Sequence, residues 1–131
     1  MIATFRDMEN KANELNGTAI HDGDRLRQIL YGMQDKEPFV CELVGDNGFY
    51  LAIGVGPVGF VEYSRYDGSP PHLMAVSPVN AVEDNDKEFL AGGTPTPVEA
   101  RFCMPFDDVV KIAVYFLENS AACPFFSWEE I

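Results

Sequence analysis

The sequence predicts an α+β fold, in which two amphipathic helices pack on one face of a mostly antiparallel sheet. Two segments, residues 24–35 and 106–118, repeat apolar side chains at the spacing of one helix face. Between them, short apolar runs separated by turn signals predict a strand meander rather than alternating strands and helices. At 131 residues, the chain is expected to form a single domain, residues 1–131.

The first helix carries four apolar residues at positions i, i+3, i+4 and i+7: Leu26, Ile29, Leu30 and Met33. Asp22 or Asp24 is expected to cap its start, where an acidic side chain also complements the helix dipole.

The second helix carries a longer apolar stripe: Phe106, Val109, Val110, Ala113, Phe116 and Leu117. Pro105 suits the first helical position because its missing N–H is not needed there.

The strands of the predicted meander span residues 39–44, 49–53, 60–66 and 72–77. Asp46-Asn47-Gly48 indicates a tight hairpin turn, because Asn and Gly tolerate positive φ. Residues 98–103 alternate again, and residues 125–128 indicate a last strand or a docked extended segment.

Other segments carry weaker patterns. Residues 2–5 are compatible with an edge strand, and residues 8–15 show weak helical spacing. Residues 80–88 are expected to form an acidic loop. Residues 92–97 are expected to form a loop as well, since they are rich in Gly and Pro.

The charge balance excludes several classes of partner. The chain has 21 Asp and Glu against 9 Lys and Arg, a net charge of −12. Nucleic acid and anionic membranes repel such a protein, so direct binding to either is not expected. The sequence shows neither a long apolar run nor a signal-peptide pattern at its start, which predicts a cytoplasmic protein.

Residues 54–59 match the letters G-x-G-x-x-G of a dinucleotide-binding loop. That mechanism needs a helix directly after the motif, so that its N-terminus holds a pyrophosphate. Here the following residues, 60–63, are typical of a strand, and Pro57 removes a backbone donor. We therefore interpret the segment as a hairpin turn.

The sequence indicates no cofactor, metal site or catalytic residue. Cys41, Cys103 and Cys123 are scattered, which favours buried free thiols over a disulfide framework. His21 and His72 are far apart in the sequence and there is no C-x-x-C, so no zinc motif is present. No serine lies in a G-x-S-x-G motif. A spatial pairing of Cys103 with a histidine stays open, but the chain is not expected to be an enzyme.

Residues 83–88 form the densest acidic run. It is compatible with a solvated loop or with an electrostatic docking patch for a basic partner. A calcium loop is a weaker alternative, because the ligand spacing of an EF-hand is missing.

The C-terminal half contains a series of recognisable features. They are Gly92-Gly93-Thr94-Pro95-Thr96-Pro97-Val98-Glu99-Ala100, Met104-Pro105, the Phe106–Leu117 helix, Pro124 and Ser127-Trp128-Glu129-Glu130. With the hairpins at 43–54 and 59–63, they resemble a family of bacterial polymorphic-toxin immunity proteins with an α+β fold and a near-terminal tryptophan. The resemblance covers roughly residues 24–130, and its signature residues have structural roles: Gly92, Gly93, Pro105, Phe116 and Trp128.

The sequence departs from the family at one point. The family usually has a Gly and an Arg between the helix and the proline, whereas Asn119–Cys123 precede Pro124 here. We therefore expect the second helix to end differently. Trp128 is interpreted as an anchor for the tail, with an interface hot spot as the alternative.

Members of this family are typically found beside secreted toxins with nucleic-acid deaminase domains. The resemblance thus implies that this chain neutralises a cognate toxin by covering its basic surface, without chemistry of its own. The residues expected to contact the toxin are Glu83, Asp84, Asp86, Glu88, Tyr66 and Asp67. The alternatives are an acidic nucleic-acid mimic that inhibits another enzyme, and a small-molecule-binding or enzymatic domain with a concave polar pocket.

Overall fold

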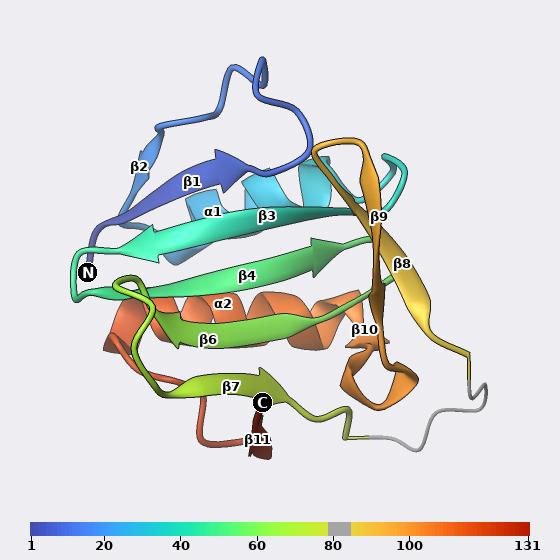
Figure 1. The fold of residues 1–131 in the computed structure, drawn as a ribbon. Helices are drawn as coiled ribbons and strands as arrows, with labels where there is room; N and C mark the ends of the chain where they lie inside the picture. Colours follow the sequence, from blue (N-terminus) through green and yellow to red (C-terminus); the bar gives the residue numbers. More distant parts are fainter. Residues whose placement is uncertain (79–84) are drawn as a thin grey trace.

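A twisted antiparallel sheet forms the centre of the protein (Figure 1). The structure is a computed structural model that describes residues 1–78 and 85–131. Its helices are α1 (Gly23–Gly32), α2 (Phe106–Asn119) and a short 3-10 helix (Ala100–Phe102). Its strands are β1 (Ala3–Asp7), β2 (Ala19–Ile20), β3 (Phe39–Gly45), β4 (Phe49–Val55), β5 (Val58–Gly59), β6 (Val61–Arg65), β7 (His72–Ala75), β8 (Lys87–Ala91), β9 (Thr94–Val98), β10 (Met104–Pro105) and β11 (Trp128–Glu130).

The order of the strands confirms the predicted meander. The main path of the sheet runs β11-β7-β6-β4-β3-β1-β2, and every pair along it is antiparallel. The hairpin turn at Asn47-Gly48 joins β3 to β4, with Gly48 at a φ of 83°. Only the single bridge between β3 and β8, Phe39 to Leu90, is parallel within the described residues.

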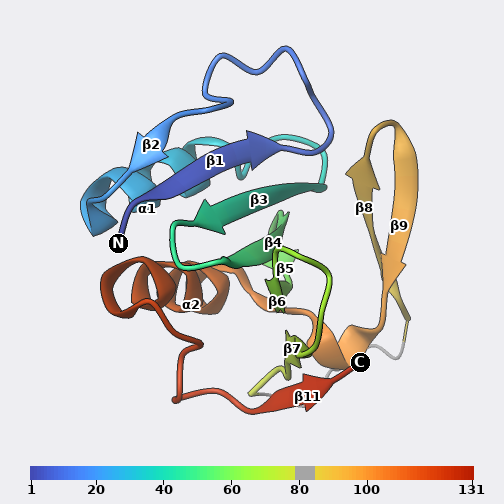
Figure 2. The ribbon, with the colours of Figure 1, turned by 60° about the vertical axis from the view of Figure 1, so that its left-hand side comes forward.

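Both helices cover the same face of this sheet, as predicted (Figures 1 and 2). Their apolar stripes and the inward side chains of β1, β3, β4 and β6 form one continuous core. The carboxylate of Asp22 caps α1 by accepting a hydrogen bond from the Asp24 backbone N–H at 2.8 Å. Pro105 lies one residue earlier than predicted, as the N-cap of α2 rather than its first residue.

The end of α2 differs from the glycine-containing end that the family resemblance implies. Ser120 adopts a left-handed conformation with a φ of 56°, and its backbone N–H donates to the Phe116 carbonyl at 2.8 Å. Glycine usually takes this position because it has no Cβ to strain. The side-chain amide of Asn47 donates to the Ser120 carbonyl at 3.2 Å and holds this turn against the β3–β4 hairpin.

The N-terminal segment agrees only in part with its sequence pattern. Residues 3–5 belong to a strand, β1, but it is not an edge strand, because β1 lies between β3 and the two-residue β2. Residues 8–15 form turns rather than helix. The buried Asp7 carboxylate accepts hydrogen bonds from the backbone of Glu9 and Asn10 and from the Asn13 amide, which offers the chain an alternative to helical hydrogen bonds.

Residues 92–97 do not form the predicted loop. Gly92 and Gly93 make a tight turn at φ values of 59° and 80°, and residues from Thr94 onward pair with β8 as β9. Two prolines fit this strand because β9 pairs with β8 alone, and an edge strand leaves alternate N–H positions without a partner. The alternation at 98–103 is also not a strand, since Ala100–Phe102 form a 3-10 helix.

The Gly54–Gly59 segment is a hairpin, as predicted. It contains the end of β4 and the short β5, and β6 follows it directly. A Cβ atom on Gly59 would lie 2.1 Å from the Gly54 carbonyl oxygen, so glycine is required for the close approach of the two backbones.

Candidate functional site

The described residues cover only part of the sheet face opposite the helices. The β8–β9 hairpin lies over one end of it (Figure 2) and encloses a second, smaller apolar cluster. This cluster consists of Val40, Phe60, Met74, Phe89, Val98 and Phe102. The rest of the helix-free face carries polar and charged side chains, and we describe it as the candidate site.

One row of paired residues crosses this face from strand to strand. Its members, in spatial order, are Arg6, Glu42, Ala52, Glu62, Met74 and Glu129. The Arg6 guanidinium lies 3.7 Å from the Glu42 carboxylate, and Glu129 pairs with Arg101. Among the described residues, no lysine or arginine forms an ion pair with Glu62. The row therefore contains three carboxylates and one guanidinium, and Arg101 beside Glu129 adds a second guanidinium.

Burial affects the chemistry of two of these carboxyl groups. Desolvation raises the pKa of Glu62, although His72 and a hydrogen bond with Ser64 oppose the shift. Desolvation also raises the pKa of Glu42, and the nearby Arg6 opposes it. Both carboxylates lose part of their hydration in the folded chain, so an added cation would interact favourably with them.

Hydroxyl and aromatic groups continue the polar surface toward the β6–β7 turn. The Arg6 guanidinium donates to the Tyr66 hydroxyl at 3.1 Å. The rings of Tyr50 and Tyr66 meet edge to face at 6.0 Å. Tyrosines combine apolar area with a polar tip, which suits a protein interface.

Ser64 and His72 supply two residue types of a catalytic triad without its geometry. The Ser64 Oγ lies 3.2 Å from Nδ1 of His72, whose Nε2 lies 3.2 Å from the Gly68 carbonyl oxygen. A serine nucleophile needs an accessible hydroxyl and an acid on the far side of the imidazole. Ser64 is 0% exposed, and a backbone carbonyl takes the place of the acid. This arrangement does not suit nucleophilic attack.

Cys103 also lacks the environment of a reactive thiol. Its sulfur contacts the backbone carbonyls of Val98 and Glu99 at 3.9 and 3.6 Å. Burial raises the pKa of the Cys103 thiol to about 11. A catalytic cysteine shows the opposite shift, because the thiolate is the nucleophile.

A pocket of about 400 Å³ opens where the β8–β9 hairpin meets the row. Its floor on the sheet includes Ala52, Glu62 and Met74, and its wall includes Pro97 and Phe102. The described lining contains two glutamates, Glu62 and Glu99, and no lysine or arginine. The pocket therefore combines apolar walls with negative charge.

The structure separates the residues expected to contact a toxin. Tyr66 and Asp67 lie at the β6–β7 turn, at one end of the sheet, whereas Asp86 and Glu88 lie at the start of β8, at the other (Figure 1). Tyr66 joins the polar surface through Arg6. Asp67 accepts hydrogen bonds from the Ser69 backbone and hydroxyl, which lower its pKa. Two further residues of this set lie outside the described residues: Glu83 and Asp84.

The family-signature residues lie in turns and packing contacts. Gly92 and Gly93 form the β8–β9 turn, and Pro105 precedes α2. The buried Phe116 meets Tyr63 edge to face at 6.0 Å. Trp128 packs against the main core, and its indole N–H donates to the Cys123 carbonyl at 2.8 Å.

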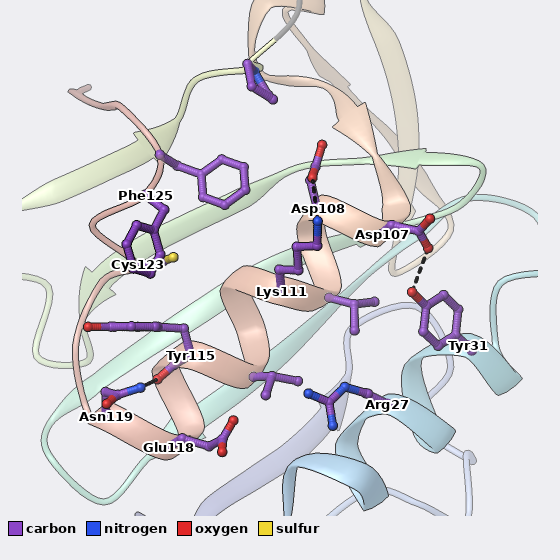
Figure 3. A pocket seen from close by; sticks show the side chains of 14 residues that line it. Arg27, Tyr31, Asp107, Asp108, Lys111, Tyr115, Glu118, Asn119, Cys123 and Phe125 are labelled. Atoms are coloured by element: carbon purple, nitrogen blue, oxygen red, sulfur yellow. Dashed lines mark hydrogen bonds and ion pairs between the residues drawn. The ribbon is translucent and has the colours of Figure 1, made fainter.

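A second, larger hollow of about 880 Å³ lies over the outer side of both helices (Figure 3). Its charged lining residues are Arg27, Asp107, Asp108, Lys111 and Glu118. Tyr31 donates to Asp107 at 2.6 Å, and Lys111 lies 3.9 Å from Asp108 (Figure 3). Phe125, at its rim, is 83% exposed. Two cations and three carboxylates give the lining of this hollow a net charge of −1, and contacts within the hollow already engage Asp107 and Asp108.

Sequence reasoning did not single out Glu42 or Glu62 as site residues. One signal was available: each glutamate alternates with apolar residues along its strand, which places it on the face opposite the core. Glu42 and Glu62 lie on either side of Ala52 because of the strand register, and the register could not be predicted from the sequence.

Other site types find no support in the described part of the chain. Residues 1–78 and 85–131 bring together no group of three His, Cys, Asp or Glu side chains suited to a metal ion. None of the helices in the described residues has the length and apolar character needed to span a membrane.

Comparison with family models gives no matching family, and a search of curated proteins gives no matching sequence.

Proposed function

We propose that this chain is a stoichiometric inhibitor that binds a bacterial toxin domain and covers the toxin's basic surface. The row of three glutamates across the helix-free face carries this proposal. These carboxylates belong to a chain with a net charge of −12, so the whole molecule attracts a basic partner and the row provides a place for it to dock.

The resemblance to polymorphic-toxin immunity proteins supplies the class of partner. A toxin that acts on nucleic acid, such as a deaminase, needs positive charge along its substrate groove. An acidic sheet face with tyrosines at its edge would compete with the nucleic acid for that groove. Inhibition by occlusion requires no reaction, in agreement with the buried Ser64 and the raised pKa of Cys103.

Co-expression with the partner tests the proposal. The C-terminal domain of a secreted toxin encoded directly upstream is expressed in bacteria with and without this chain. We expect growth to be restored and the two proteins to co-purify at one to one. Cell death together with a failure to co-purify would overturn the proposal, and a metabolic operon around the gene would count against it.

Charge variants test the binding face. Glu42→Gln with Glu62→Gln should slow association with the toxin by about 3–10-fold at low salt, because steering depends on local charge. Asp24→Asn with Glu118→Gln removes the same charge from exposed positions on the two helices and is the matched control. Equal association rates for the two double variants would place the interface elsewhere.

A further inference from the structure

The pocket beside the β8–β9 hairpin owes its floor to one small residue. Ala52 lies between Glu42 on β3 and Glu62 on β6 in the cross-strand row. The pocket lining includes Ala52 and Glu62 but not Glu42, so the small alanine side chain leaves a depression beside Glu62. Pro97 of the hairpin and Phe102 of the 3-10 helix close one side of this depression, and the pocket has a volume of about 400 Å³.

The pocket contains a partly buried carboxylate, that of Glu62 on its floor. The Ser64 hydroxyl and His72 lie close enough to favour its charged form. Among the described residues, no lysine or arginine pairs with it. A partly dehydrated carboxylate of this kind gains more from an incoming cation than a fully hydrated carboxylate does.

The walls select a cation with an apolar stem. Val40, Met74 and Val98 line the pocket and belong to the second apolar cluster. An arginine side chain combines a hydrocarbon stem with a planar guanidinium that forms two parallel hydrogen bonds with a carboxylate. It is also more weakly hydrated than a lysine ammonium, which lowers the cost of burying it.

We infer that this pocket receives one arginine side chain of the basic partner, with the guanidinium at Glu62 and the stem against the hairpin wall. This inference rests on the proposed function, and it specifies the contact at the centre of the proposed interface with the toxin. Arginines that enter well-packed pockets are frequent hot spots of protein interfaces.

The first experiment uses the free protein and needs no toxin. Butylguanidinium is titrated into the full chain labelled with ¹⁵N, with butanol as the neutral probe of the same stem. We expect butylguanidinium to shift the amide signals of Ala52, Glu62 and Met74 with millimolar affinity, and Glu62→Gln to weaken the effect. Equal shifts with butanol would make the pocket a site for neutral apolar ligands, and no shift would also overturn the assignment.

The second experiment uses the complex with the toxin. Glu62→Gln removes the charge while keeping the shape, and Ala52→Leu fills the depression while keeping the charge. Each is expected to raise the dissociation rate by about 10–100-fold, because a buried charge contact acts mainly on dissociation. Glu130→Gln, an exposed glutamate on β11, is the control and should change it by less than about 2-fold.

The outcomes separate the two proposals. Tight binding of the wild-type chain with no effect of either pocket variant overturns the arginine pocket and leaves the inhibitor function intact. No binding of the wild-type chain overturns the inhibitor function, and the butylguanidinium titration then still decides whether the pocket takes a guanidinium. Circular dichroism of both variants verifies that they are folded.

Discussion

Glu42 and Glu62 lie in one cross-strand row of the sheet, on either side of Ala52. Burial raises the pKa of both carboxyl groups, and the charge of Glu62 contributes to the shift at Glu42. Two like charges in this position do not favour the folded chain by themselves. The arrangement is therefore expected to reduce stability at neutral pH and to favour a cationic partner.

Glu62→Gln should make folding stability less dependent on pH. Because the pKa of Glu62 is raised above 4.5 in the folded state, the folded chain binds this proton more tightly than the unfolded chain does. The resulting stabilisation is fully present below the unfolded pKa and is lost as the pH rises through the folded pKa. Urea unfolding from about pH 4 to about pH 8 should show the wild type losing stability relative to Glu62→Gln. A constant difference between the two proteins across this range would contradict the prediction.

Trp128 is expected to stabilise the fold. Its ring meets Tyr63 edge to face at 6.1 Å, and its N–H donates to the Cys123 carbonyl. Trp128→Ala should cost about 2–4 kcal/mol of unfolding free energy, and Trp128→Phe about 1 kcal/mol through loss of the hydrogen bond. Urea unfolding followed by circular dichroism measures both without a tryptophan signal. Phe125→Ala is the control and should change stability by less than about 0.5 kcal/mol, since Phe125 is 83% exposed.

Gly59 and Gly32 should respond oppositely to alanine. A Cβ on Gly59 would collide with the Gly54 carbonyl at 2.1 Å, whereas a Cβ on Gly32, in the last turn of α1, meets no atom within 4 Å. Gly59→Ala is expected to cost at least about 2 kcal/mol, and Gly32→Ala to add up to about 1 kcal/mol. Thermal unfolding of the two variants compares them directly. If Gly59→Ala were as stable as the wild type, the prediction that the two backbones lie too close for a Cβ atom would be wrong.

Cys103 should react slowly in the folded protein. With a thiol pKa of about 11, roughly one molecule in a thousand carries the thiolate at pH 8. Cys41 is fully buried and should be slower still. Iodoacetamide labelling followed by peptide mass spectrometry should show slow modification of the native chain and rapid modification in urea. If iodoacetamide modified Cys103 in the folded chain as fast as it modifies an unprotected thiol, the pKa of Cys103 would not be raised.

Local sequence patterns identified most of the regular structure. The apolar residues of α1 and α2 follow the helical period, and that period depends only on neighbours along the chain. Asp22 and the Asn47-Gly48 turn could be recognised for the same reason, since a cap or a tight turn needs only a few consecutive residues. These elements form a meander because consecutive strands need only short turns to pair.

The β8–β9 hairpin shows where local patterns were insufficient. Proline has no backbone N–H to donate to a neighbouring strand, so Pro95 and Pro97 by themselves indicate that residues 94–98 do not form a strand. They are accommodated because β9 is an edge strand and the tight turn at Gly92-Gly93 brings it back onto β8. Whether a strand lies at an edge is a property of the assembled sheet, so residues 94–98 could not be assigned from their composition.

The sequence by itself determined the α+β class, the two helices on one face, the meander and the net charge of −12. Tertiary structure alone decided where that charge acts: strand register brings Glu42, Ala52 and Glu62 into one row, and the hairpin forms a wall beside them. The physical reason is that side chains alternate along a strand with a period of two, so neighbours across a face are set by pairing and not by distance in sequence.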